Sequence, residues 1–171
     1  VEPLTGELHA ALLARGGAFE IILVDDGSGD GSDAEILRCV ERYPGVRGLF
    51  LARNYGQSTA LQAGFESALG DVVVSLDGDQ QNDPKDIPRL VATLLDEGVD
   101  MVSGWRRKRH DGAVRVYLSR VANRFISRLT GVRLHDYGCT LKAYRRDMLD
   151  QIRVYGELHR FIPALMAEVG A

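Results

Sequence analysis

Short apolar runs alternate with amphipathic segments through most of this chain. Runs rich in Val, Ile and Leu predict strands, and segments with apolar residues at helical spacing predict helices. The predicted strands are 19–25, 46–51, 71–77 and 99–103, and the predicted helices are 4–15, 32–43, 56–69 and 84–97. Right-handed crossovers between such elements give an α/β fold, in which helices flank a mostly parallel sheet.

Two of these helices have recognisable starts. Ser32 is expected to cap the helix 32–43, because Glu35 follows three residues later as in a capping box. Pro84 stands in the first turn of the helix 84–97, where a missing amide proton costs nothing.

After Trp105 the pattern changes to a long arginine-rich helix over 113–129, a loop, a short strand near 140–144 and helices to the end. Neither an internal repeat nor a linker is evident, so residues 1–171 are expected to form one domain. The chain opens on a helix and closes in an apolar helical segment. We therefore expect a fragment of a longer protein that lacks the first strand and the C-terminal region.

The apolar run before Asp77 ends in two carboxylates one residue apart, Asp77 and Asp79. On an extended backbone both side chains point to the same side, and Gly78 between them leaves room for a bulky ligand. Hard oxygen donors so placed suit Mg²⁺ or Mn²⁺, which complete their coordination with water and substrate phosphates. A diphosphate-bearing substrate is the first expectation, and a plain turn at the strand end is the alternative.

A second buried strand also ends in acids, Asp25 and Asp26, followed by Gly27 and Ser28. This loop could hold the base and ribose of a nucleotide. The glycine spacing does not fit a dinucleotide fingerprint, and Leu37 occupies the position where a calcium loop requires glutamate. A plain strand-to-helix turn stays open.

Polar residues follow the next strand as well, at 53–58. Arg53 or the start of the following helix could meet a phosphate, or the segment could be a turn in which Ser58 caps the helix. His110 and His135 lie in predicted loops without metal-ligand partners, so surface or supporting roles are expected for both.

Composition narrows the class of protein. The formal net charge is −3, 45% of the residues are hydrophobic, and two cysteines form neither a disulfide framework nor a zinc spacing. With so few cysteines, a reducing cytoplasm is the expected environment. A soluble domain is expected, because no apolar stretch approaches the roughly 20 residues that cross a bilayer.

The charges are unevenly distributed. Acids dominate 25–100, and basic residues gather at Arg106, Arg107, Lys108, Arg109, Arg115, Arg120, Arg124 and Arg128. An acidic metal end and a basic anion-binding end follow. A solvated helix face is the main alternative, and nucleic acid is not an expected partner because interleaved aromatics are sparse.

Five motifs together resemble glycosyltransferase family 2, and within it the polyisoprenyl-phosphate glycosyltransferases, the group that includes dolichol-phosphate mannose synthase. The resemblance runs over about 19–148. Its motifs are Val24-Asp25-Asp26-Gly27-Ser28, Arg53-Asn54-Tyr55-Gly56-Gln57, Leu76-Asp77-Gly78-Asp79-Gln80-Gln81-Asn82-Asp83-Pro84, Gly104-Trp105-Arg106-Arg107 and Asp136-Tyr137-Gly138-Cys139.

The resemblance implies a GT-A fold and inverting transfer of a hexose from a UDP- or GDP-sugar to a polyprenyl phosphate such as dolichyl or undecaprenyl phosphate. It implies a nucleotide-sugar site formed by Asp25, Asp26, Gly27, Ser28, Arg53, Gln57, Asp77 and Gly78. Asp77, Asp79 and Gln81 would hold Mg²⁺ or Mn²⁺, and Arg106, Arg115 and Ser119 would grip the acceptor phosphate. Asp136 would lie in the stretch that lines the sugar pocket, and the catalytic set would be Asp79, Arg106, Arg115 and Asp136.

The charge map agrees with this chemistry. A phosphate acceptor is already an anion, so it needs arginines to position it more than a base to deprotonate it. The expected location is the cytoplasmic face of a membrane, reached through regions absent from this chain, and a homo-oligomer stays open. The alternatives are a soluble family 2 transferase acting on a polysaccharide or other hydroxyl acceptor, and a non-catalytic nucleotide-sugar binding module.

Overall fold

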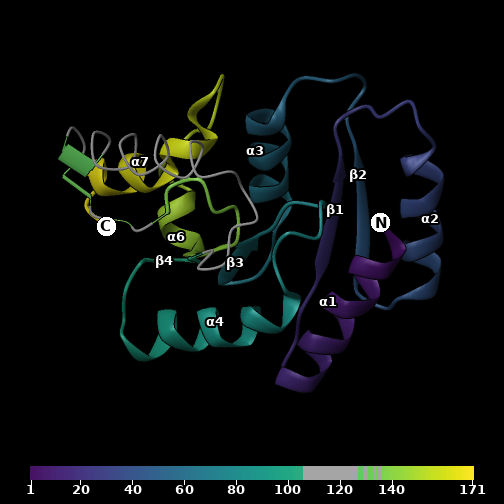
Figure 1. Cartoon of the computed structure of the whole chain (residues 1–171), viewed down its shortest axis with the longest axis horizontal. Helices are drawn as coiled ribbons and strands as arrows, with labels where there is room; N and C mark the ends of the chain where they lie inside the picture. The colour runs from purple at the N-terminus through teal and green to yellow at the C-terminus, as the bar shows by residue number, and fades with distance from the viewer. Residues whose placement is uncertain (106–126, 129–130, 133, 135) are drawn as a thin grey trace, which may run out of the picture.

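The computed structural model describes residues 1–105, 127–128, 131–132, 134 and 136–171. Within them the chain follows the predicted order of strands and helices (Figure 1). The strands are β1 (Ile21–Asp25), β2 (Val46–Phe50), β3 (Val72–Ser75), β4 (Met101–Ser103) and β5 (Lys142–Arg145). The α-helices are α1 (Glu2–Arg15), α2 (Ser32–Arg42), α3 (Gln57–Ser67), α4 (Ile87–Asp96), α6 (Arg146–Leu149) and α7 (Ile162–Glu168), with short 3₁₀ turns at η1 (Pro84–Asp86) and η2 (Leu158–Phe161). The arginine-rich helix predicted over 113–129 falls largely outside the described residues.

The strands pair in two groups. β1 and β2 are parallel, with Ile21 opposite Val46. β5 lies between β3 and β4 and is antiparallel to both, so that Tyr144 has Val73 on one side and Met101 on the other. The strand predicted near 140–144 is therefore confirmed, and it reverses direction within an otherwise parallel arrangement of β3 and β4.

Alternating residues of β3, β4 and β5 point into two apolar clusters. Ala143, together with Val72, Val74 and Val102, packs with residues of α1 and α4. Tyr144, together with Val73 and Met101, packs with residues of α3, α6 and α7. Successive strand side chains face opposite sides of a sheet, so helices cover both faces here.

Several local details differ from prediction. Ser32 does not cap α2: the cap is Gly31 with φ 88°, and the Ser32 N–H is instead bound by Asp30 Oδ1 at 3.0 Å. Glu35 turns away to the chain start, where it accepts from the Glu2 N–H. The predicted helix 84–97 begins with the turn η1, because Asp83 Oδ1 accepts from the Lys85 N–H at 2.9 Å.

Both cysteines, Cys39 and Cys139, are buried, and no disulfide joins them. Among the helices that the structure describes, none combines the length and apolar character needed to cross a bilayer.

Candidate functional site

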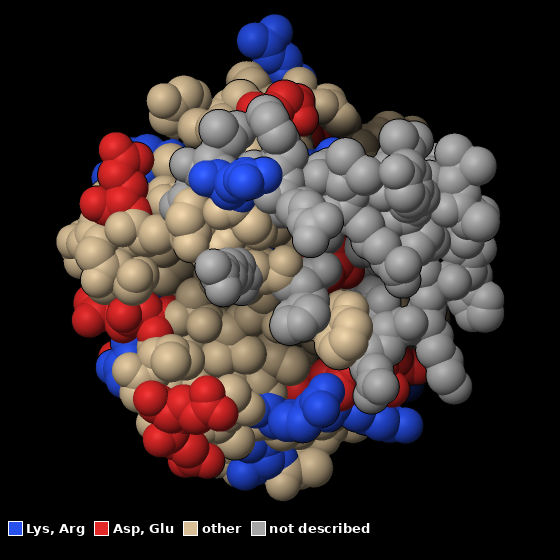
Figure 2. All heavy atoms as spheres, turned by 60° about the vertical axis from the view of Figure 1, so that its left-hand side comes forward, with Lys and Arg blue, Asp and Glu red and all other residues tan. Residues whose placement is uncertain are grey.

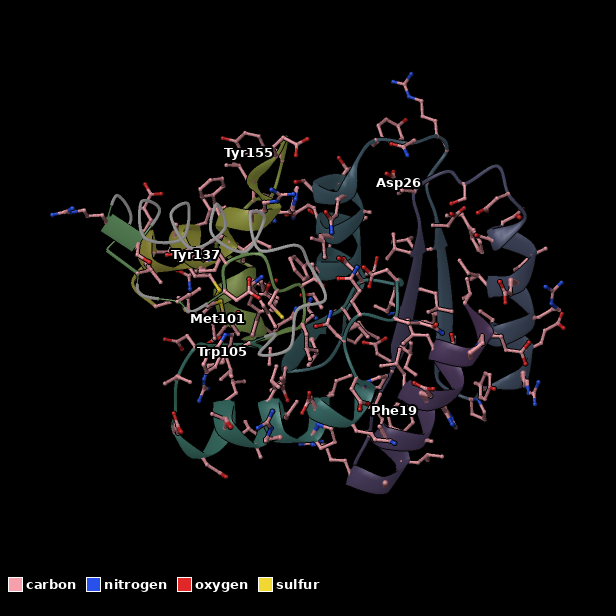
Figure 3. The ribbon with its side chains drawn as sticks, in the orientation of Figure 1. Phe19, Asp26, Met101, Trp105, Tyr137 and Tyr155 are labelled. Atoms are coloured by element: carbon pink, nitrogen blue, oxygen red, sulfur yellow. The ribbon has the colours of Figure 1, made fainter. Side chains whose placement is uncertain are left out.

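The loops after β1 and β2 are joined by a single carboxylate. Asp26 accepts from the backbone N–H groups of Tyr55 and Gly56, both at 2.8 Å. Gly56 is the N-cap of α3, so Asp26 binds two amides at the start of that helix, where a negative charge is favoured. Figure 3 shows Asp26 at the end of β1, beside the loop that leads to α3.

Gly27 lets the same two loops touch. Its φ is +69°, and a Cβ there would lie 2.4 Å from the carbonyl carbon of Arg53. Beside this contact the Arg53 guanidinium lies over the Tyr55 ring, 5.0 Å from its centroid, on an exposed part of the loop. The Arg53 backbone therefore lies against Gly27, and its predicted contact with a nucleotide stays a prediction.

Asp25 forms a hydrogen bond within the loop that follows β1. Its side chain is buried, and its carboxylate accepts from the Ser28 N–H at 3.2 Å. Both acids of the Asp25-Asp26 pair thus have structural hydrogen bonds, which sequence reasoning did not foresee. Their proposed contacts with a nucleotide remain a prediction.

Replacing Asp26 by Asn is expected to lower the free energy of unfolding by about 1–3 kcal/mol, because an amide oxygen can accept only one of the two N–H groups and its NH₂ faces the other. Urea denaturation measures this change. The control is Asp30→Asn, at an exposed position with one backbone N–H partner that an amide oxygen can still accept. Equal stability of Asp26→Asn and Asp30→Asn would contradict the loop-joining role.

The loop after β3 brings Asp77 to the start of α3. Gln57 Nε2 donates to Asp77 Oδ1 at 2.9 Å, so the predicted site residues Gln57 and Asp77 lie together. A Cβ at Gly78 would meet nothing within 4 Å, so open space lies beside Asp77 as expected.

The predicted extended geometry of Asp77 and Asp79 is wrong. β3 ends at Ser75, and Gly78 and Asp79 form a turn. Asp79 Oδ1 accepts from the Gln81 N–H at 3.0 Å, and Gln80 between them has a φ of 60°. Asp and Asn side chains close such turns by accepting a backbone N–H two residues later, and this local preference overrides the strand.

The donor set fits a hard divalent cation in kind. Asp77, Asp79 and Gln81 supply carboxylate and amide oxygens, the ligands that Mg²⁺ and Mn²⁺ prefer. In the part of the chain that the structure describes, no group of three or more His, Cys, Asp or Glu side chains forms a metal cluster. Mg²⁺ commonly keeps several waters and takes further oxygen ligands from substrate phosphates.

A small pocket of about 20 Å³, room for about one water molecule, opens beside Asp77. Its lining combines α3, the end of β3, β5 and the segment before α7, and consists of Gln57, Leu61, Ser75, Leu76, Asp77, Thr140, Lys142, Tyr144, His159 and Ile162. Sequence reasoning assigned roles to Gln57 and Asp77 and missed Lys142 and His159, because both lie far along the chain in no motif.

His159 lines the pocket, and its ring contacts Ser58. Its Nδ1 lies 3.0 Å from Ser58 Oγ, and Ser58 is therefore not the helix cap considered from sequence. Burial lowers the pKa of His159, and Arg160 lowers it further, while Glu157 and Asp77 act in the opposite direction. The ring is thus held toward its neutral form.

Two further residues that line the pocket, Tyr144 and Lys142, are buried. Burial raises the pKa of Tyr144 well above its usual range, so the phenol stays protonated. The Lys142 ammonium is buried and donates to the backbone carbonyls of Tyr137 and Cys139. Lys142 therefore ties the turn 136–139 to β5.

In the turn around Asp136, the residues Asp136, Tyr137 and Cys139 are buried and Gly138 is exposed. Asp136 Oδ1 accepts from the Gly138 N–H at 3.1 Å, and the Tyr137 hydroxyl donates to the Val132 carbonyl at 2.7 Å. Asp136 is not among the residues that line the pocket beside Asp77. Its catalytic role stays a prediction. Arg106 and Arg115, predicted as catalytic and acceptor-binding, and Ser119, predicted to bind the acceptor phosphate, lie outside the described residues.

Figure 2 shows one face of the molecule, on which Lys and Arg side chains of the described residues are interspersed with Asp and Glu. The predicted basic cluster over 106–128 lies almost entirely outside the described part of the chain, so the basic end of the charge map stays a prediction.

Comparison with solved structures defines the class of fold. Glucosyl-3-phosphoglycerate synthase from Mycobacterium tuberculosis, in complex with phosphoglyceric acid, superposes with a TM-score of 0.66 at 22% identity, over 88% of this chain and 55% of the other. A mannosyltransferase from Pyrobaculum calidifontis, in complex with GDP-Man and Mn²⁺, gives a TM-score of 0.59 at 25% identity, over 86% and 42% of the two chains. The fold is therefore that of a GT-A glycosyltransferase, as predicted.

The sequence then identifies the family. Residues 2–153 match Glycosyl transferase family 2, and the chain belongs to this family. It is 46% identical to dodecaprenyl-phosphate galacturonate synthase of Rhizobium johnstonii, over 99% of this chain and 51% of that protein. It is 48% identical to undecaprenyl-phosphate 4-deoxy-4-formamido-L-arabinose transferase of Pseudomonas aeruginosa, over 92% and 46%. The chain spans about half the length of these relatives, and the predicted resemblance to polyprenyl-phosphate glycosyltransferases is confirmed.

Proposed function

We propose that this chain is the donor-binding and metal-binding part of an enzyme that transfers a sugar from a nucleoside diphosphate sugar to a polyprenyl phosphate. The observation that carries the proposal is the meeting of Asp77 with Gln57 beside a pocket, in a chain 46–48% identical to two enzymes named for polyprenyl-phosphate products. Two loops after parallel strands and the loop after β3 supply the residues, at the strand ends where ligands of α/β sheets bind.

Within this proposal, Asp25, Asp26, Gly27, Ser28 and Arg53 form the nucleotide end of the donor site. Asp77, Asp79 and Gln81 would hold Mg²⁺ or Mn²⁺. A divalent ion bound there supplies Lewis-acid stabilisation of the departing nucleoside diphosphate. Gln57 donates to Asp77 and so fixes the orientation of that carboxylate.

The acceptor side follows from the chemistry of a phosphate nucleophile. Arg106, Arg115 and Ser119 would bind the acceptor phosphate and present its oxygen to the anomeric carbon, on the face opposite the leaving group. Attack from that face inverts the anomeric configuration. No general base is required, because the acceptor is already ionised. The enzyme would act at the cytoplasmic face of a membrane, where such a lipid phosphate meets a soluble donor.

Transfer of labelled sugar tests the proposal. The complete gene product, in membranes, is offered a panel of UDP- and GDP-sugars, including a uronic acid and an aminoarabinose derivative, with undecaprenyl phosphate as acceptor and with or without Mn²⁺. We expect a lipid-phosphate sugar that forms only with the metal. Transfer to a hydroxyl acceptor, or nucleotide binding without lipid product, would contradict the proposal in favour of a soluble transferase or a binding module.

A further inference from the structure

The segment that leads into α7 is tied to one face of α3. Ser58 and Gln62 are four residues apart and therefore neighbours on the helix surface. Gln62 Oε1 accepts from the Val154 N–H at 2.8 Å, and Ser58 Oγ accepts from the His159 N–H at 3.2 Å. Figure 3 shows Tyr155, which lies between these two attachment points, close to α3. His159 is thus held against the helix whose first residue contacts Asp77.

The same contacts are compatible with one particular tautomer of the His159 ring, which the inference below uses. The Ser58 side chain is only 1% exposed, and its hydroxyl oxygen already accepts from the His159 backbone. Its proton is therefore available to His159 Nδ1, which lies 3.0 Å away. When the Ser58 hydroxyl donates to Nδ1, the proton of a neutral ring is on Nε2, because a neutral imidazole has one acceptor and one donor nitrogen.

The His159 ring lines the pocket together with Asp77 and Gln57. Because Ser58 occupies Nδ1, the polar group that the ring can offer to a pocket ligand is Nε2–H. An anionic oxygen is the strongest partner for such a donor. Under the proposed function, the ligand that brings anionic oxygens next to Asp77 is the diphosphate of the sugar donor.

We infer that His159 is a donor-binding residue: Ser58 orients its ring, and Nε2–H binds an oxygen of the nucleoside diphosphate. This inference rests on the proposed function. It assigns a substrate contact to a residue 82 positions after Asp77 in the sequence, on a segment that carries none of the family motifs noted above.

Two substitutions separate the two ring nitrogens. The amide of Asn reaches about as far as Nδ1, and the longer Gln reaches about as far as Nε2. In the complete gene product, His159→Gln is expected to keep the donor KM within about threefold of the wild type, whereas His159→Asn raises it by about 10-fold to 100-fold. Melting temperatures of both variants are measured in parallel.

Equal changes of the donor KM in the two variants, or a smaller change in His159→Asn, overturn the inference. His159 would then act only through its hydrogen bond to Ser58. Titration calorimetry with UDP and GDP in the presence of Mn²⁺ gives the same comparison without an acceptor. If the wild type transfers no sugar to polyprenyl phosphate, the proposed function fails, and the calorimetric order of the two variants still decides the role of His159.

Discussion

Asp79→Ala is expected to reduce metal-dependent sugar transfer by about 10²–10³-fold or more, because removing a charged group that stabilises the leaving diphosphate acts directly on the transition state. The fold should stay nearly intact, with a change of about 1 kcal/mol or less in the free energy of unfolding, since Asp79 is exposed and forms one local hydrogen bond. Steady-state transfer assays and urea denaturation on the same preparation measure both quantities.

The chain offers a closely matched control for Asp79. Asp83 is also exposed and also accepts from the backbone N–H two residues later, that of Lys85, at 2.9 Å. Asp83→Ala should therefore lose a similar hydrogen bond without loss of transfer. Asp79→Asn keeps an acceptor for the Gln81 N–H but removes the charge, and it should be as inactive as Asp79→Ala. Normal transfer by either Asp79 variant would remove the metal assignment.

Gly27→Ala is expected to have the largest effect on folding. A methyl group at this position would lie 2.4 Å from the Arg53 carbonyl carbon and 2.7 Å from the Asn54 nitrogen, so the backbone of one loop must move. Overpacking of this kind costs about 1–3 kcal/mol. The left-handed backbone, with φ +69°, adds about 1–2 kcal/mol for a residue with a Cβ. We also expect nucleotide binding to weaken, because the displaced loop carries Arg53.

Gly31→Ala separates the two contributions. Gly31 has a φ of +88°, but a Cβ there meets nothing within 4 Å. It therefore reports the backbone cost alone, and Gly27→Ala should be less stable than Gly31→Ala by roughly the overpacking term of 1–3 kcal/mol. Thermal and urea unfolding of the two variants provide the comparison. Equal destabilisation would show that the loops after β1 and β2 separate at little cost.

Local pattern was sufficient for most of the fold. The apolar runs that predicted strands at 19–25, 46–51 and 71–77 became β1, β2 and β3, each shortened at one end or both. The shortening has a local cause at Asp77, where the turn over Gly78 and Asp79 stops the strand. Capping was less predictable. Gly31 displaced Ser32 as the cap of α2 because Asp30 binds the Ser32 N–H.

Other features depended on contacts between distant segments. A short run at 142–145 cannot indicate from its own composition that it will lie between β3 and β4, since this pairing is decided by partners tens of residues away. The Asp25-Asp26 pair likewise looked like two ligands, but Asp26 binds backbone amides 29 and 30 residues later. The predicted basic cluster over 106–128 lies almost entirely outside the described residues.

The sequence by itself determined the α/β class and the family, because apolar periodicity and contiguous motifs are local properties of a chain. It also predicts Asp77, Asp79 and Gln81 as metal ligands, and that assignment stays a prediction. Only the tertiary structure decided that Gln57 contacts Asp77, that Lys142 holds the turn 136–139, and that His159, which lines the pocket, contacts Ser58. These contacts span 3 to 101 residues, and those that join separate elements form only when packing of the two apolar clusters brings α3, β5 and the segment before α7 together.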